Sequence, residues 1–287
     1  MVSHEVWPNF LVIGAYKSGT TSIYSYLRKH PDVYMPLIKE PSFFALEGEV
    51  GEIPKNKTAR LKDYLQLFDA WNGESAVGEA SPIYLQSRKA AQRISHYIPG
   101  AKLVAILRNP VEAFHSNHYM RIRLGKTDKD FSSAVDEYLD RLKSSPDAGP
   151  FYFKHLSYYF ELFDPRQIRV YLFDDLKRDS AALMKDLYGF IDVDPEYPVD
   201  VTRRQNRGRI PRSRYLYQLS CGNTPLGKRI PARLRTLIDR LNSQPIPDMS
   251  KEDRTRLMEC FGEDIEQLGR LIGRDLSMWL NGPSGGK

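Results

Sequence analysis

Cysteine is scarce in this sequence. Cys221 and Cys260 are the only two among 287 residues, they form no C-x-x-C pair, and no histidine stands beside either at the spacing of a metal ligand. Two free thiols are typical of a reducing compartment, and a disulfide framework or a structural zinc site needs more cysteines than this. We therefore expect a cytoplasmic protein without a metal site.

Long apolar runs are also missing. No stretch of about 18 apolar residues occurs, so the sequence predicts no membrane-spanning helix. Residues 1–8 have neither the basic nor the apolar region of a signal peptide. The apolar share of 41% is nevertheless enough for a sizeable core. We expect one domain over residues 1–280 and a flexible tail at 281–287.

Acidic residues are fewer than basic ones, 36 against 42, which gives a formal charge of +6. This balance suits an anionic ligand, an acidic glycan or nucleic acid. Residues 203–214 contain six arginines and no acid, and such a run repels itself unless it meets an anion. The run could be a phosphate-binding flap, a groove for an acidic glycan, or a solvated basic loop.

The N-terminal part of the chain predicts a strand, a glycine-bounded loop and a helix. Phe10 to Ile13 form a short apolar run, as in a strand buried on both faces, and Gly14 ends it. Apolar side chains recur at helical spacing from Thr20 to His30, and Pro31 stops that pattern. Loop N–H groups and a helix dipole together form a cradle for an anion, so we expect a phosphate here.

This loop lacks the lysine of a nucleoside triphosphate site. Gly14 and Gly19 have the spacing of G-x-x-x-x-G-K-[ST], but Thr20 occupies the lysine position and Lys17 lies inside the loop. A lysine inside the loop is suited to the phosphate that the loop surrounds, which argues against a triphosphate. The alternative is an ordinary strand–turn–helix with a surface lysine.

Two motifs together resemble the PAPS-dependent sulfotransferases (PAPS is 3′-phosphoadenosine 5′-phosphosulfate). Residues 17–21, Lys-Ser-Gly-Thr-Thr, resemble that family's 5′-phosphosulfate loop, and Arg108 with Ser116 looks like its 3′-phosphate motif. Ser22 replaces the tryptophan of the cytosolic members, so the chain looks closer to the bacterial and heparan-type branches. The resemblance implies PAPS as donor and no metal. The implied PAPS-binding residues are Lys17, Ser18, Gly19, Thr20, Thr21, Ser22, Arg108 and Ser116, with Arg207 and Gly208 as a loosely matching basic flap.

The resemblance also implies a catalytic glutamate. Residues 39–44, Lys-Glu-Pro-Ser-Phe-Phe, match the segment in which heparan-type enzymes place that residue, which makes Glu40 the expected base and Lys17 the second catalytic residue. Ser42 stands where many relatives have histidine, which excludes a histidine base there. From the sequence alone, Lys39 and Glu40 could equally be solvated charges. Rival bases are Glu79 and a histidine such as His115 or His118.

Another segment departs from the family pattern. Residues 78–82, Gly-Glu-Ala-Ser-Pro, resemble a Gly-Glu-x-[ST]-Pro segment in which the heparan 3-O-type enzymes have a catalytic lysine, and Ala80 stands in its place. Phe173 stands where an adenine-side tyrosine often does. Ser42 and Ala80 together keep open a degenerate, non-catalytic family member.

Strands alternate with helices along the chain, which predicts an α/β fold: a P-loop-like parallel sheet with helices on both faces, in a single domain. We expect the site where the loops after Ile13, Glu79 and Leu107 meet. The further strand and helices are expected at 168–173, 180–191, 231–241 and 250–271.

The predicted function is transfer of a sulfuryl group from PAPS to a hydroxyl or amine by in-line displacement, with a carbohydrate or glycoconjugate as the expected acceptor. The predicted partners are PAPS and a small-molecule or glycan acceptor, without nucleic acid. The alternatives are a P-loop kinase, which lacks its lysine here, and a polyanion- or nucleic-acid-binding protein that uses residues 203–214.

Overall fold

A computed structural model describes residues 5–146, 148–200, 209–221 and 224–281. Its contacts gather into two compact units. The first unit comprises Met1–Pro110, Gly149–Gln205 and Phe261–Lys287, and the second comprises Val111–Ala148 and Asn206–Cys260. The domain limits expected from the sequence stay a prediction.

The first unit contains a five-stranded parallel sheet, in the order β2-β3-β1-β4-β5. The central strand β1 is buried along its whole length, which explains its unbroken run of apolar residues. This sheet confirms the predicted fold class. The strands are β1 (Phe10–Gly14), β2 (Val33–Tyr34), β3 (Ala76–Ala80), β4 (Lys102–Leu107) and β5 (Ile168–Leu172).

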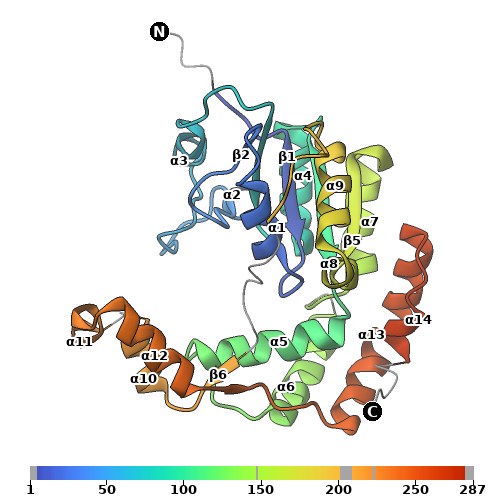
Figure 1. Cartoon of the computed structure of the whole chain (residues 1–287). Helices are drawn as coiled ribbons and strands as arrows, with labels where there is room; N and C mark the ends of the chain where they lie inside the picture. The colour runs from blue at the N-terminus through green and yellow to red at the C-terminus, as the bar shows by residue number, and fades with distance from the viewer. Residues whose placement is uncertain (1–4, 147, 201–208, 222–223, 282–287) are drawn as a thin grey trace. The chain divides into compact units, whose positions relative to one another are not determined.

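Helices cover both faces of this sheet (Figure 1). On one face, α1 (Thr20–Leu27) and α9 (Ser180–Phe190) pack on alternate residues of β1 and β4 and form the main apolar core with them. On the other face lie α4 (Arg88–Tyr97) and α7 (Tyr152–Leu162), whose apolar sides are buried. Both faces of the inner strands β1 and β3 are therefore buried, as expected for parallel strands.

The helices at Phe43–Leu46, Phe173–Arg178 and Ser277–Leu280 escaped the sequence pattern, because they are too short to show a period. The strand expected over residues 168–173 ends one residue early, at Leu172, and a helix begins at Phe173. The Asp175 carboxylate accepts a 3.2 Å hydrogen bond from the N–H of Leu172 and so caps this helix. The short helices are α2 (Phe43–Leu46), α3 (Leu61–Leu65), α8 (Phe173–Arg178) and α14 (Ser277–Leu280), with 3-10 turns at Gln66–Phe68, Tyr84–Gln86 and Pro165–Gln167.

The second unit is mainly helical, with one antiparallel strand pair, β6 and β7. Two long helices, α5 and α13, have residues in both units. The elements are α5 (Pro110–Arg123), α6 (Phe131–Ser144), β6 (Arg209–Pro211), α10 (Arg214–Ser220), α11 (Pro225–Arg229), α12 (Ala232–Asn242), β7 (Ser243–Pro245) and α13 (Lys251–Ile272).

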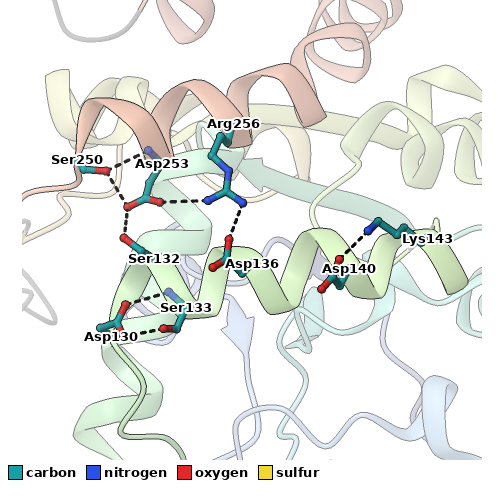
Figure 2. A network of polar contacts seen from close by, with 9 residues as sticks. All are labelled: Asp130, Ser132, Ser133, Asp136, Asp140, Lys143, Ser250, Asp253 and Arg256. Atoms are coloured by element: carbon teal, nitrogen blue, oxygen red, sulfur yellow. Dashed lines mark hydrogen bonds and ion pairs between the residues drawn. The ribbon is translucent and has the colours of Figure 1, made fainter.

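A polar network joins α6 to the start of α13 within this unit (Figure 2). The buried Asp253 carboxylate accepts hydrogen bonds of 2.7 Å from the hydroxyls of both Ser132 and Ser250. Arg256 donates to Asp136 at 2.6 Å, one turn further along. A buried carboxylate needs such partners to offset its desolvation, so the network holds the two helices together. Within the described residues, no helix is both long and apolar enough to cross a membrane.

Candidate phosphate-binding site

The loops after β3, β1 and β4 lie at one edge of the sheet, because these strands are neighbours and run in parallel. Hydrogen bonds connect the loop ends to the neighbouring strands: the N–H of Ala15 donates to Ile106 at 2.7 Å, and that of Ser81 donates to Val12 at 3.1 Å. The predicted meeting of the loops after Ile13, Glu79 and Leu107 is therefore confirmed.

The loop between β1 and α1 has an unusual backbone. Both Lys17 and Gly19 have left-handed conformations, with φ of 63° and 96°. A Cβ at Gly19 would also lie 2.8 Å from Leu176 and 3.1 Å from Phe173, so only glycine fits there. Left-handed lysine costs free energy, and residues kept in such strain cluster at ligand-binding sites. The conformation is thus consistent with the predicted role of Lys17 in binding, which stays a prediction.

Hydrogen-bond donors converge on this loop. The first N–H groups of α1 have no acceptor within the helix, and Gly19, which precedes the helix, has no side chain to cap them. No acidic residue occurs in the first turn of α1. Ser18 and Thr20 are buried and Lys17 is half-buried. The helix dipole and the lysine together favour an anion here.

Arg108, the residue after β4, contacts the same loop. Its Nη1 donates to the carbonyl oxygen of Lys17 at 3.4 Å, and its guanidinium lies 5.0 Å from the centre of the Phe173 ring. The structure thus brings together Lys17 and Arg108, from the two predicted phosphate motifs. Ser116 lies on α5 in the second unit, and its pairing with Arg108 stays a prediction. Arg207 and Gly208 lie outside the described residues.

Tyr152 of α7 is a neighbour that the sequence pattern did not single out. Burial raises the pKa of its phenol, while Ser18 and the positive charge of Arg108 oppose that rise. Tyr152 therefore lies close to both phosphate motifs, inside the first unit. Tyr152 itself is buried. No local signal separates it from the other buried tyrosines.

The Lys39–Glu40 pair also reaches the loop. Nζ of Lys39 lies 2.5 Å from Oε1 of Glu40, and the two side chains are 18% and 31% exposed, so the two charges form a half-buried pair. The N–H of Glu40 donates to the carbonyl of Ala80 at 3.1 Å. Burial and the charge of Glu40 raise the pKa of Tyr16 to about 12. Glu40 is therefore close to a residue of the phosphate loop.

Glu79, the rival base, is fully buried beneath this segment. Its Oε2 accepts a 2.9 Å hydrogen bond from Ser81, whose hydroxyl in turn accepts a 3.0 Å hydrogen bond from the N–H of Ser42. Burial raises the pKa of Glu79 to about 7, and the charge of Glu40 adds to the rise while Ser81 and Lys39 oppose it. Glu79 thus supports the Glu40 segment from within the core.

The support matters because this segment has a strained backbone. Glu40 and Ser42 have φ of 62° and 60°, which is uncommon for residues other than glycine. The hydroxyl of Ser42 donates to the carbonyl of Glu40 at 3.1 Å, and the N–H of Ser42 bonds to Ser81. Two hydrogen bonds on Ser42 therefore hold the turn that directs Glu40.

The histidines offered as alternative bases lie in the second unit. The rings of His115 and His118 contact Phe131 edge to face, with centroids 4.8 Å and 5.4 Å away. Burial and the neighbouring His115 lower the pKa of His118. Both rings therefore pack on Phe131 within that unit, and their role as a base stays a prediction. Over the residues described, no group of three or more His, Cys, Asp or Glu side chains could hold a metal ion.

Comparison with known proteins agrees with this arrangement. Residues 8–206 match the family described as "Sulfotransferase domain". The chain is 27% identical over 211 residues to bifunctional heparan sulfate N-deacetylase/N-sulfotransferase 1 of Caenorhabditis briggsae, covering 69% of this chain and 24% of that protein. It is 25% identical over 295 residues to human bifunctional heparan sulfate N-deacetylase/N-sulfotransferase 3, covering 95% of this chain and 31% of that protein. The chain thus spans between a quarter and a third of the length of these relatives.

A solved structure is similar over nearly the whole chain. The crystal structure of a sulfotransferase from Alicyclobacillus acidocaldarius superimposes with a TM-score of 0.74 at 27% identity, and covers 96% of this chain and 99% of its own. The similarity extends beyond the residues that the family pattern matches, into the C-terminal third.

Proposed function

The chain belongs to the sulfotransferase domain family, and on that premise we propose that it transfers a sulfuryl group from PAPS to a hydroxyl or amine of a carbohydrate or glycoconjugate. The observation that carries the proposal is the contact between the two phosphate motifs, in which Arg108 donates to the carbonyl of Lys17. One motif alone would fit many phosphate ligands. Two cationic groups beside one loop suit a nucleotide with two separate phosphate groups.

The chemistry of the donors fits PAPS. Lys17, the N–H groups at the start of α1, and the hydroxyls of Thr20 and Thr21 are all donors, and the first turn of α1 contains no acid that would repel an anion. In the proposal, the residues that hold the 5′ side are Lys17, Ser18, Gly19, Thr20, Thr21 and Ser22. Those that hold the 3′ side are Arg108, Ser116, Arg207 and Gly208.

PAPS supplies the activated sulfuryl group, together with a phosphate that leaves with the electron pair of the broken bond. The role of Lys17 and the α1 N–H groups is to stabilise the negative charge that grows on this phosphate. Donors held in place by the fold are effective because they need no reorganisation during the reaction. The left-handed backbone of Lys17 is one such constraint.

Glu40 takes the proton of the acceptor hydroxyl or amine. A carboxylate oxygen is the atom that can accept this proton, and Oε1 of Glu40 lies 2.5 Å from Nζ of Lys39 in the half-buried pair. The hydrogen bonds from Ser42 to Ser81, and from Ser81 to Glu79, keep the segment in position. Ser42 itself has no group that could act as a base.

A carbohydrate acceptor is supported by the names of the relatives, two of which are heparan sulfate N-sulfotransferases. Those proteins are three to four times longer than the part that this chain matches, so the acceptor class is part of the proposal. The choice between a hydroxyl and an amine depends on the acceptor.

The experiment compares nucleotides by thermal denaturation and then tests for transfer. Adenosine 3′,5′-bisphosphate should raise the melting temperature more than ATP with Mg²⁺ does. At a concentration of a hundred times its Kd, the bisphosphate should stabilise the folded protein by about 2.7 kcal/mol. Incubation with PAPS and a panel of amino sugars and glycans should then yield a sulfated product. Equal shifts with both nucleotides would reject the PAPS site, and a larger shift with Mg-ATP would favour a kinase. Steeply salt-dependent binding to any polyanion, without preference for the bisphosphate, would favour the nucleic-acid alternative.

A further inference from the structure

Helix α12 in the second unit exposes a row of leucines. Leu234, Leu237 and Leu241 are 48%, 48% and 69% exposed. Their spacing of three and four residues puts them on one side of the helix, since an α-helix has 3.6 residues per turn. Leu226 on the adjacent helix α11 is also exposed. Helices of globular proteins normally turn such a row towards the core, whereas the described residues of this unit leave the row uncovered.

The orientation of this leucine row is fixed by the fold. α12 packs against α10, and its last residue, Asn242, is buried. The side chain of Asn242 accepts a 2.7 Å hydrogen bond from the N–H of Ser213 and donates a 2.8 Å hydrogen bond to the carbonyl of Ser213. The N–H of Arg212 donates to the carbonyl of Asn242 at 2.7 Å. Three hydrogen bonds therefore lock the end of α12 to the start of α10.

Cations border the leucines. Arg233 and Arg240 each precede a leucine of the row and are seven residues apart, so they lie together along one edge of it. The exposed basic side chains of α11 and α12 are Lys228, Arg229, Arg233 and Arg240. The surface formed by these four cations with Leu226, Leu234, Leu237 and Leu241 is called here the leucine–arginine face.

The positive charge of the whole protein comes from this part of the chain. Residues 209–242 contain eight Arg and Lys but a single acid, Asp239. The remaining residues hold 34 basic and 35 acidic side chains, so their formal charge is −1 against +6 for the full chain. Four of these eight cations, Lys228, Arg229, Arg233 and Arg240, belong to the leucine–arginine face, and their excess over acids suits an anionic partner for that surface.

We propose that the leucine–arginine face docks the protein on an anionic lipid surface. The leucine side chains enter the boundary between headgroups and acyl chains, and the flanking Arg and Lys side chains bind the lipid phosphates. The leucine row matches the apolar acyl-chain region of such a surface, and the cationic edge matches its layer of anionic phosphates. Docking of this kind is independent of the nucleotide site, because none of these residues belongs to it.

The charge argues against a second copy of the chain as occupant. A twofold dimer through this face would bring two identical cationic edges together, and like charges in contact oppose association. The rest of the chain, with its formal charge of −1, provides little attraction for the cations. An anionic membrane meets both the apolar and the charged part of the face.

The test is co-sedimentation of the full chain with phosphatidylcholine vesicles that contain or lack phosphatidylglycerol. The wild-type protein should sediment with the anionic vesicles and remain in solution with the neutral ones, and added salt should weaken the binding. A variant carrying Leu234→Ser, Leu237→Ser and Leu241→Ser should partition at least tenfold less. Arg233→Gln combined with Arg240→Gln should also reduce binding.

Matched controls alter exposed side chains elsewhere. Leu124→Ser and Leu162→Ser remove exposed leucines outside the face, and Arg166→Gln removes an exposed arginine. These controls should sediment as the wild type does. Melting temperatures and bisphosphate affinity of all variants should match the wild type, which shows that a loss of sedimentation is not a loss of fold.

Several results would overturn the proposal. One is the absence of any difference between anionic and neutral vesicles. Another is equal loss of binding in the face variants and in the controls. The third result would come from light scattering, which would detect a concentration-dependent oligomer. If the triple leucine variant abolished this oligomer, the face would be an interface between copies of the chain.

Discussion

The guanidinium of Arg108 lies 5.0 Å from the centre of the Phe173 ring. Arg108 follows β4 and Phe173 begins α8 directly after β5, so two neighbouring parallel strands place the pair. The contact and the hydrogen bond to Lys17 both restrict the long arginine side chain. An arginine already held in position loses less conformational entropy when it binds a phosphate.

Arg108→Ala should weaken the binding of adenosine 3′,5′-bisphosphate by roughly 10- to 100-fold, because a charge-assisted hydrogen bond contributes about 1.5–3 kcal/mol. Arg108→Lys should fall in between, since it keeps the charge but loses the planar fork. Isothermal titration calorimetry measures both. The control is Arg166→Ala, which removes an exposed arginine paired with Asp164. Unchanged affinity in Arg108→Ala would remove this residue from the site.

Lys17→Ala should lower kcat for sulfation by about 10²–10³ and weaken nucleotide binding much less. The charge that Lys17 opposes grows on the leaving phosphate mainly in the transition state, so its loss is felt in the rate. Steady-state kinetics with PAPS and titration with adenosine 3′,5′-bisphosphate separate the two effects. Lys143→Ala, an exposed lysine on α6 paired with Asp140, is the control. A variant with only KM altered would show that Lys17 binds but does not assist the reaction.

Glu40→Gln should lower kcat by about 10²–10⁴ while bisphosphate affinity is kept. Glutamine preserves the shape of the side chain but cannot accept a proton from the acceptor. Rates on an acceptor sugar, with affinity from calorimetry, test this expectation. Glu49→Gln, which changes an exposed carboxylate near Lys89, serves as the control. Retention of more than about a tenth of the wild-type kcat would exclude Glu40 as the base.

Glu79→Gln should change the pH dependence of stability. The folded state raises the pKa of Glu79 from 4.5 to about 7, so it binds a proton more tightly than the unfolded chain does. The free energy of unfolding therefore falls as pH rises through this window, by roughly 3 kcal/mol at about 1.4 kcal/mol per pH unit. Glutamine cannot ionise and its amide oxygen can still accept from Ser81.

Urea unfolding at pH 5 and pH 8 measures this effect. The Glu79→Gln variant should lose less stability between the two pH values than the wild type, and should be the more stable protein at pH 8. Glu79→Ala should be destabilised at both, since it leaves a cavity and removes the partner of Ser81. An identical pH dependence in wild type and Glu79→Gln would show that Glu79 is already ionised in the folded protein.

The sequence by itself determined the α/β class of the first unit, its first strand and helix, and the residues of both phosphate motifs. The run from Phe10 to Ile13 and the helical spacing after Thr20 are local patterns, and the glycine spacing between them depends only on neighbouring residues. Because parallel strands end at the same edge, these patterns also predicted that the loop after Leu107, which begins with Arg108, would approach the loop that contains Lys17. The structure confirms that approach.

The surroundings of the carboxylates were decided only by the tertiary structure. Glu40 and Glu79 are both acidic residues near prolines, yet one lies half-buried beside Lys39 and the other is fully buried beneath Ser81. The difference depends on the pairing of β3 with β1 and on the left-handed turn at Glu40, which are long-range and conformational features. The spacing of residues along the chain predicts neither the strand pairing nor the left-handed turn.

Helix α12 was predicted from the sequence, but the exposure of its leucines was not. Its helical period was visible, and the helix predicted over residues 231–241 is observed at Ala232–Asn242. Leu234, Leu237 and Leu241 have the spacing of a core-facing row, and only the packing of α12 on α10 leaves them exposed. A hydrophobic period predicts that one side of a helix will be buried. The tertiary contacts decide whether other parts of the same chain bury it.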